Sequence, residues 1–282
     1  MVLLAYGLLG LIIGSFLNVL IIRYGARSLG GRSSCMACGA PLAWFDMIPV
    51  VSWIYLRGKC RACHARISIQ YPIVEALTGI VFAVIGAALH PFSLLLLISL
   101  GMVALLIAIA VYDFHHTIIP DAWVYSFAVL AFISNFIGSS PPDQATFFGI
   151  LLAGPIAAFP LFSLWLVSRG RWMGLGDAKL ALGIGWLLGP VLGISSVFFA
   201  FIIGALVSVP LVILSSEWWK NFIKGFTPTP ISQRLVWGFT MGSEIPFGPF
   251  LVCSCIIIWL SLLYDIALPH IFGDLLLLNF SL

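Results

Sequence analysis

Charged residues are scarce in this chain. Only 8% of its 282 residues are Asp, Glu, Lys or Arg, whereas 62% are hydrophobic. So little charge cannot cover a soluble globular surface, and the composition therefore excludes a soluble domain and indicates a membrane protein. The formal net charge is only +3, and membrane topology accounts for it, as shown below. The charge thus gives no reason to expect a nucleic-acid partner.

Long polar stretches are also rare, and apolar runs occupy most of the chain. A helix needs roughly 17 to 25 predominantly apolar residues to cross a bilayer. Eight segments are predicted to do so, of which the sixth is short and glycine-rich: Val2–Ile22, Ile73–Leu89, Phe92–Tyr112, Ala122–Ile137, Phe147–Val167, Ala178–Leu188, Val191–Leu214 and Ile245–Ile266. We therefore expect an all-α polytopic membrane protein with about eight transmembrane helices.

Lys and Arg are absent from every second connection between these segments. All thirteen lie after the first segment, around the junction of the fifth and sixth, or between the seventh and eighth. Basic residues collect in cytoplasmic loops, so we predict that the N-terminus is outside and that these connections are cytoplasmic. The first run has no basic region before it and no small-residue cleavage site after it. We expect it to be a retained helix and not a secretory signal.

Two of the few acidic residues stand beside long apolar runs. Asp113 ends the third predicted span, and Asp177 precedes the sixth within Gly174-Leu175-Gly176-Asp177. A charged Asp at mid-membrane costs roughly 2.5 to 3.5 kcal/mol on insertion scales, and such residues usually face a protein interior or a wet cavity. Asp177 could alternatively only cap a helix, a role that explains Asp113 poorly. The predicted topology places both at the cytoplasmic membrane face.

Such a pair can perform acid–base chemistry. Two neighbouring carboxylates share a proton, because ionising both at short range is unfavourable. One can then take a proton from a water molecule that attacks a peptide carbonyl, while the other donates a proton. We therefore expect Asp113 and Asp177 to be the catalytic residues of an aspartic protease, one that needs no metal for cleavage.

The only large hydrophilic segment, residues 24–71, carries two Cys-x-x-Cys motifs. Four thiolates at this kind of spacing suit a tetrahedral structural zinc, and a reducing cytoplasm disfavours disulfides. Redox-active dithiols or unligated cysteines are the alternatives. The four predicted ligands are Cys35, Cys38, Cys60 and Cys63. The adjacent His64 is surplus to such a site, so we expect it at the surface.

Other polar or irregular features are expected to have ordinary roles. Cys253 and Cys255 in the last span should pack as small hydrophobic residues. The tryptophans of Glu217–Glu244 favour anchoring at the membrane interface, with partner binding as the alternative. Pro246–Pro249 either lines the aspartate site or only starts a helix. Gly7, Gly10 and Gly14 suit close helix contact, and Asn18 an interhelical hydrogen bond.

The motifs together resemble a known family, the bacterial type IV prepilin peptidases. These are bifunctional leader peptidases and N-methyltransferases of the GxGD aspartic protease type. The resemblance runs through most of the chain and rests on these segments: Gly14–Val19, Cys35–Gly39, Trp44–Pro49, Ser52-Trp53, Leu56–Gly58, Cys60–Cys63, Tyr71–Gly79, Asp113, Ile119–Asp121, Gly174–Lys179 and Pro246–Pro249.

The resemblance implies a function. The protein would cleave prepilins or pseudopilins at the cytoplasmic face of the bacterial inner membrane, and would methylate the new amino terminus with S-adenosylmethionine. Asp113 and Asp177 match the family's catalytic aspartates. The methyltransferase activity is implied by the resemblance alone. For Glu75, binding a substrate amine and a structural or helix-start charge are both open.

The resemblance also divides the chain into residues 1–23 (first helix), 24–71 (cytoplasmic tetra-cysteine domain linked to methylation) and 72–282 (membrane peptidase domain). Two other classes of function stay open on the residues alone. Intramembrane aspartates also mark transporters with a cation or proton relay. A noncatalytic assembly platform could use the cysteine domain for docking.

Overall fold

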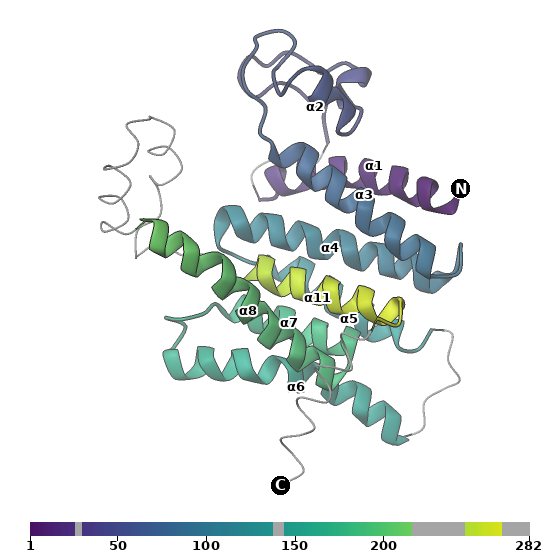
Figure 1. Cartoon of the computed structure of the whole chain (residues 1–282), viewed down its shortest axis with the longest axis vertical. Helices are drawn as coiled ribbons and strands as arrows, with labels where there is room; N and C mark the ends of the chain where they lie inside the picture. Colours follow the sequence, from purple (N-terminus) through teal and green to yellow (C-terminus); the bar gives the residue numbers. More distant parts are fainter. Residues whose placement is uncertain (26–29, 138–143, 216–245, 267–282) are drawn as a thin grey trace.

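The structure is a computed structural model, and it describes residues 1–25, 30–137, 144–215 and 246–266. Figure 1 shows a stack of helices with a small irregular domain at one edge. The helices are α1 (Val2–Arg23), α2 (Val51–Tyr55), α3 (Gln70–Ala88), α4 (Leu94–His116), α5 (Asp121–Ser134), α6 (Gln144–Ser168), α7 (Leu175–Leu188), α8 (Pro190–Ser215) and α11 (Gly248–Leu263), with a 3-10 turn η1 (Trp44–Met47). Over these ranges no strand forms, only two isolated bridges.

The all-α prediction is confirmed, and each predicted span falls on a helix. Among the described residues, five helices, α1, α3, α4, α6 and α8, are long and apolar enough to cross a membrane. Helices α5, α7 and α11 are shorter, at 14, 14 and 16 residues. The structure thus supports a multi-pass membrane protein, while the count of eight spans stays a prediction.

Helices α1 and α3 pack closely through the predicted small residues. A methyl group added at Gly10 would lie 2.6 Å from the Thr78 carbonyl oxygen, and one at Gly14 would lie 2.7 Å from the Cα of Glu75. Asn18 of α1 donates from Nδ2 to the carbonyl oxygen of Tyr71 in α3 at 3.2 Å. The predicted helix contact and interhelical hydrogen bond are therefore both confirmed.

Helix α4 is the centre of the bundle. It lies between α3 and α11 in Figure 1 and also contacts α1 and α5. Its side chains are buried on several faces, and Met102, Val103, Leu106 and Ile109 are fully inaccessible. Thr117, in the left-handed conformation at φ 51°, ends the helix by donating from its backbone N–H to the Asp113 carbonyl. Asp113 is thereby held in the last turn.

Candidate active site and cysteine cluster

Asp113 is a buried carboxylate at one end of α4. Its side chain is only 4% exposed. Oδ2 accepts a hydrogen bond of 3.0 Å from the backbone N–H of Gly248, the first residue of α11. The free N–H groups and partial positive charge of a helix N-terminus stabilise an anion there. Helix α11 therefore supplies a donor to a carboxylate that α4 positions.

Asp177 lies in the first turn of α7 and is 8% exposed. Gly174, not Asp177, occupies the N-cap position of this helix, and no side-chain cap is made there. Capping therefore does not explain Asp177, although its position in the first turn suits the positive end of the helix dipole.

Helices α4, α7 and α11 bring the two aspartates together. The side chain of Ile119 lies between their elements: a methyl group added at Gly176 would be 3.0 Å from Ile119 Cβ, and one at Gly248 would be 3.3 Å from Ile119 Cδ1. Because Asp113 is hydrogen bonded to Gly248, Ile119 lies between the Asp113 carboxylate and Gly176, the neighbour of Asp177. The predicted pair therefore meets in one place despite its separation in sequence.

Pro246–Pro249 has both of the roles that the sequence left open. It starts α11, with a proline in the first helical positions. It also brings the Gly248 backbone so close to Asp113 that an added methyl group would lie 2.6 Å from Oδ2. A side chain at position 248 would have to displace the Asp113 carboxylate or the start of α11, and the contact spans 135 positions.

Asp121 takes no part in this buried pair. Its side chain is 59% exposed and forms a 2.7 Å ion pair with Lys179 of α7. An exposed pair of this kind contributes about 0 to 1 kcal/mol. Its role is to join the starts of α5 and α7 beside the candidate site.

The four predicted metal ligands also converge. The Sγ atoms of Cys35, Cys38, Cys60 and Cys63 all lie within 4.8 Å of one another, and Cys35 and Cys63 are 3.8 Å apart. Four thiolates at Zn–S distances of about 2.3 Å in a tetrahedron are separated by about 3.8 Å. The described cysteines of this segment thus fit a tetrahedral metal ion.

The two cysteine turns share one backbone design. The backbone N–H of Cys35 and that of Cys60 each donate to the carbonyl oxygen of the residue five positions later. The carbonyl oxygen of each cysteine accepts a hydrogen bond of 2.8 to 2.9 Å from the N–H of the residue four positions later. That fourth residue is Gly39 in one turn and His64 in the other, at φ 72° and 56°. His64 is exposed, as expected, and its place in the turn is conformational.

The thiols of this cluster do not share one acidity. Backbone hydrogen bonds from Cys38 and Ala37 lower the pKa of the Cys35 thiol to about 6. For Cys63 the hydrogen bond from Ala65 acts in the same sense, but the neighbouring thiols and desolvation outweigh it and raise its pKa to about 11. A second or third thiolate close to the first is disfavoured without a cation, so the cluster suits a metal that neutralises them.

Of the remaining predictions, one was partly wrong. Cys255 is buried as expected, but Cys253 is exposed on α11. Its side chain lies on the other face of the helix, which hydropathy cannot distinguish. The Glu217–Glu244 segment lies outside the described residues.

Sequence reasoning missed an aromatic cluster beside Asp113. Tyr24 at the end of α1 contacts Tyr112 of α4 and Trp123 of α5, with ring centroids 5.5 and 4.5 Å apart. Tyr112 also stacks on His116 at 4.2 Å. The only sequence signal was an aromatic residue near the end of each of three predicted spans. The cluster joins the end of α1 to the end of α4 and the start of α5.

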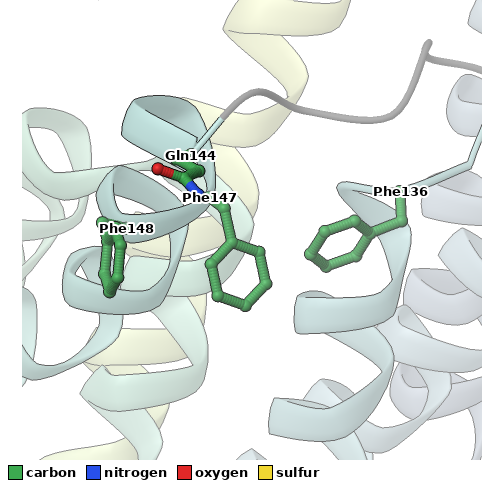
Figure 2. A pocket seen from close by; sticks show the side chains of 4 residues that line it. All are labelled: Phe136, Gln144, Phe147 and Phe148. Atoms are coloured by element: carbon green, nitrogen blue, oxygen red, sulfur yellow. The ribbon is translucent and has the colours of Figure 1, made fainter.

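A surface hollow of about 640 Å³ lies between the end of α5 and the start of α6, lined by Phe136, Gln144, Phe147 and Phe148. Figure 2 shows Phe136 facing Phe147 across it. It lies at the opposite end of α5 from Asp121, and therefore away from the aspartate pair.

Fold and site together define a polytopic membrane protein with a buried aspartate pair and a tetra-cysteine domain. The Bacterial Peptidase A24 N-terminal domain matches residues 8–89, and the Type IV leader peptidase family matches residues 100–209. The chain belongs to the type IV leader peptidase family, as its motifs indicated. No solved structure gave a significant match.

Named relatives agree with this family. The chain is 31% identical over 232 residues to the prepilin leader peptidase/N-methyltransferase of Neisseria gonorrhoeae, covering 71% of this chain and 79% of that protein. The Vibrio cholerae protein of the same name is 28% identical over 273 residues, covering 92% and 97%. The Myxococcus xanthus protein of that name is 34% identical over 218 residues, or 74% of this chain and 63% of the relative.

Proposed function

We propose that this protein cleaves the leader peptide of type IV prepilins or pseudopilins and N-methylates the new amino terminus. The observation that carries the proposal is the burial of Asp113 and Asp177 together, where α4 ends and α7 and α11 begin. Family membership favours this function over a cation relay or a noncatalytic platform, because the relatives are named prepilin leader peptidase/N-methyltransferase.

The hydrogen bonds suggest how the two carboxyl groups divide the work. Gly248 N–H stabilises negative charge on Asp113, so we assign Asp113 as the carboxylate that takes a proton from the attacking water. Asp177 then carries the shared proton and donates it to the carbonyl oxygen as the water oxygen bonds to the carbonyl carbon. When the tetrahedral intermediate collapses, the carbon–nitrogen bond breaks and the leaving nitrogen takes the proton held by Asp113. One hydroxyl group of the intermediate returns its proton to Asp177, so both carboxyl groups regain their starting states.

The site's place at helix ends suits a substrate whose own helix stands in the bilayer. Asp113 is three residues from the end of α4, and Asp177 is two from the start of α7. At about 1.5 Å per residue both lie within one helical turn of the helix ends. A prepilin helix beside them would present its leader junction at this level, and binding would orient the scissile bond.

We further propose a structural zinc ion at Cys35, Cys38, Cys60 and Cys63. When bound, the ion would balance the thiolate charges and fix the two cysteine turns relative to each other. S-adenosylmethionine would be the co-substrate that supplies the methyl group. We assign residues 24–71 to methylation, and residues 72–282 to the peptidase.

The proposed location is the bacterial inner membrane, with the N-terminus outside. The aspartate pair and the cysteine domain would both face the cytoplasm. The distribution of Lys and Arg in the sequence supports this orientation.

Cleavage of a purified prepilin by the full-length protein in detergent micelles tests the peptidase. Asp113→Asn and Asp177→Asn should each lower the cleavage rate by about 10²-fold or more, since each removes one acid–base group. Asp121→Asn is the matched control, because Asp121 is exposed and paired with Lys179. Full activity in either of the first two variants would overturn the assignment.

A further inference from the structure

Glu75 is a second buried carboxylate, and the cleavage mechanism does not use it. It lies in α3 and is only 6% exposed. Oε2 accepts a 2.7 Å hydrogen bond from the backbone N–H of Val50, and the Ser15 hydroxyl also interacts with it. The ion pairs found among the described residues, Arg61–Asp46 and Lys179–Asp121, leave it without a cation. A buried charge normally has such a partner.

Asn18 presents a second unused acceptor beside Glu75. Its Nδ2 donates to the carbonyl oxygens of Gly14 and Tyr71, which fixes the amide orientation. Oδ1 is buried and has no hydrogen-bond partner. Tyr71 and Glu75 are one turn apart on α3, and Gly14 packs on the Cα of Glu75. The unpaired oxygen and the carboxylate without a cation therefore both lie at the contact between α1 and α3.

This part of the α1–α3 contact lies near the same helix ends as the aspartate pair. Asn18 is five residues before the end of α1, Glu75 five residues after the start of α3, and Asp113 three residues before the end of α4. Figure 1 shows α1, α3 and α4 side by side, and all three are in contact. Adjacent packed helices are about 8 to 10 Å apart. A chain end released at Asp113 would therefore reach Glu75 by a sideways shift across one or two helices.

We propose that Glu75 and Asn18 bind the amino group that cleavage creates, and that Glu75 accepts its proton before methyl transfer. This inference rests on the methyltransferase part of the proposed function. An ammonium group offers three N–H donors, which match a carboxylate without a cationic partner and an amide oxygen without a donor. It is not nucleophilic until one proton leaves.

The proposed reaction is a proton transfer followed by a methyl transfer. The protonated amine gives one proton to the Glu75 carboxylate and becomes a neutral amine. Its lone pair forms a bond to the methyl carbon of the S-adenosylmethionine sulfonium, and the carbon–sulfur bond breaks with its electrons on sulfur. The products are the N-methylated ammonium group and the neutral thioether.

The test separates methylation from cleavage by using a pilin helix that already has a free amino terminus. The full-length protein in detergent micelles is given this helix and a radiolabelled methyl donor. Glu75→Gln should lower methyl transfer by about 10²-fold or more, as expected for loss of a general base. Cleavage of the intact prepilin should be unchanged. Glu75→Asp, which keeps a carboxylate, should restore part of the methyl transfer.

A binding measurement distinguishes amine recognition from a structural role. The same helix with an acetylated amino terminus should compete poorly with the free-amine helix in the unaltered protein, and Asn18→Leu should weaken this preference. In Glu75→Gln the preference should disappear. If Glu75→Gln still distinguishes the two helices, or methylates at the normal rate, the inference is wrong.

Controls keep this inference separate from the proposed function. The Asp113→Asn protein should still methylate the free-amine helix. If the unaltered protein fails to methylate it, the proposed methyltransferase function itself is wrong. Trp53→Phe removes a hydrogen bond inside the cysteine domain, from Trp53 Nε1 to the Ile67 carbonyl, and should leave the preference for the free amine intact. If the Glu75→Gln protein loses its bound zinc and its cleavage activity as well as methyl transfer, the role of Glu75 is only structural and the inference is wrong.

Discussion

Single backbone positions decide the chemistry of the aspartate pair. The N–H of Gly248 is the one donor to Asp113 Oδ2 that the described residues show. Because Gly248 has no side chain, it makes this approach without displacing the carboxylate. The negative charge of Asp113 is thus stabilised by a neighbour that itself carries no ionisable group.

Gly248→Ala should therefore disturb cleavage without removing either carboxylate. The added methyl group would lie 2.6 Å from Oδ2, so Asp113 or the start of α11 must move. Misplacement of a catalytic group by about 1 Å can cost about 10²-fold in rate, and we expect a loss of that order in the prepilin cleavage assay. Gly101→Ala in α4, where the nearest neighbour is at 3.7 Å, should change little. Equal rates for the two variants would contradict this account.

Residue identity predicted some of these positions and not others. The two aspartates and the four cysteines stand out because their chemistry is costly or unusual where they lie. The contacts Gly248–Asp113 and Val50–Glu75 join residues 135 and 25 positions apart. They depend on how helices pack, which no local pattern records. The prediction that Cys253 is buried was wrong for the same reason, since Cys253 and Cys255 lie on different faces of one helix.

At the scale of elements, helix ends were less predictable than helix centres. Hydropathy placed the ends of two spans at Tyr112 and Ala178, but α4 continues to His116 and α7 begins at Leu175. Apolar runs locate the part of a helix that faces lipid or core, whereas hydrogen bonding continues into polar residues. As a result both aspartates lie inside helices, in the last and first turns.

The α1–α3 contact depends on glycines that face backbone atoms. Gly10→Ala would bring a methyl group to 2.6 Å from the Thr78 carbonyl oxygen, so the helices must separate. Overpacking of this kind costs about 1 to 3 kcal/mol, and we expect a lower midpoint of thermal unfolding in detergent. Gly7→Ala, with its nearest neighbour at 3.6 Å, is the matched control. A Gly10→Ala protein as stable as Gly7→Ala would show that the contact is looser than described.

At the scale of the whole molecule, the predicted topology is testable on the intact cell. His90 lies in the connection after α3 and His115 at the end of α4, and both are exposed. An impermeant maleimide should label His90→Cys from outside and His115→Cys only after permeabilisation, each compared with the parent chain. The reverse pattern would invert the orientation and place the aspartate pair outside.

The dependence of Asp113 on α11 has a consequence for biosynthesis. During translation the aspartates of α4 and α7 leave the ribosome well before Gly248 does, because α8 and the following segment are made between them. Until α11 has inserted, a nascent chain holds both acids without the amide that polarises the pair. The newly made protein should therefore be inactive toward precursors at the same translocon. It should begin to hydrolyse them only when α11 has packed against the other helices.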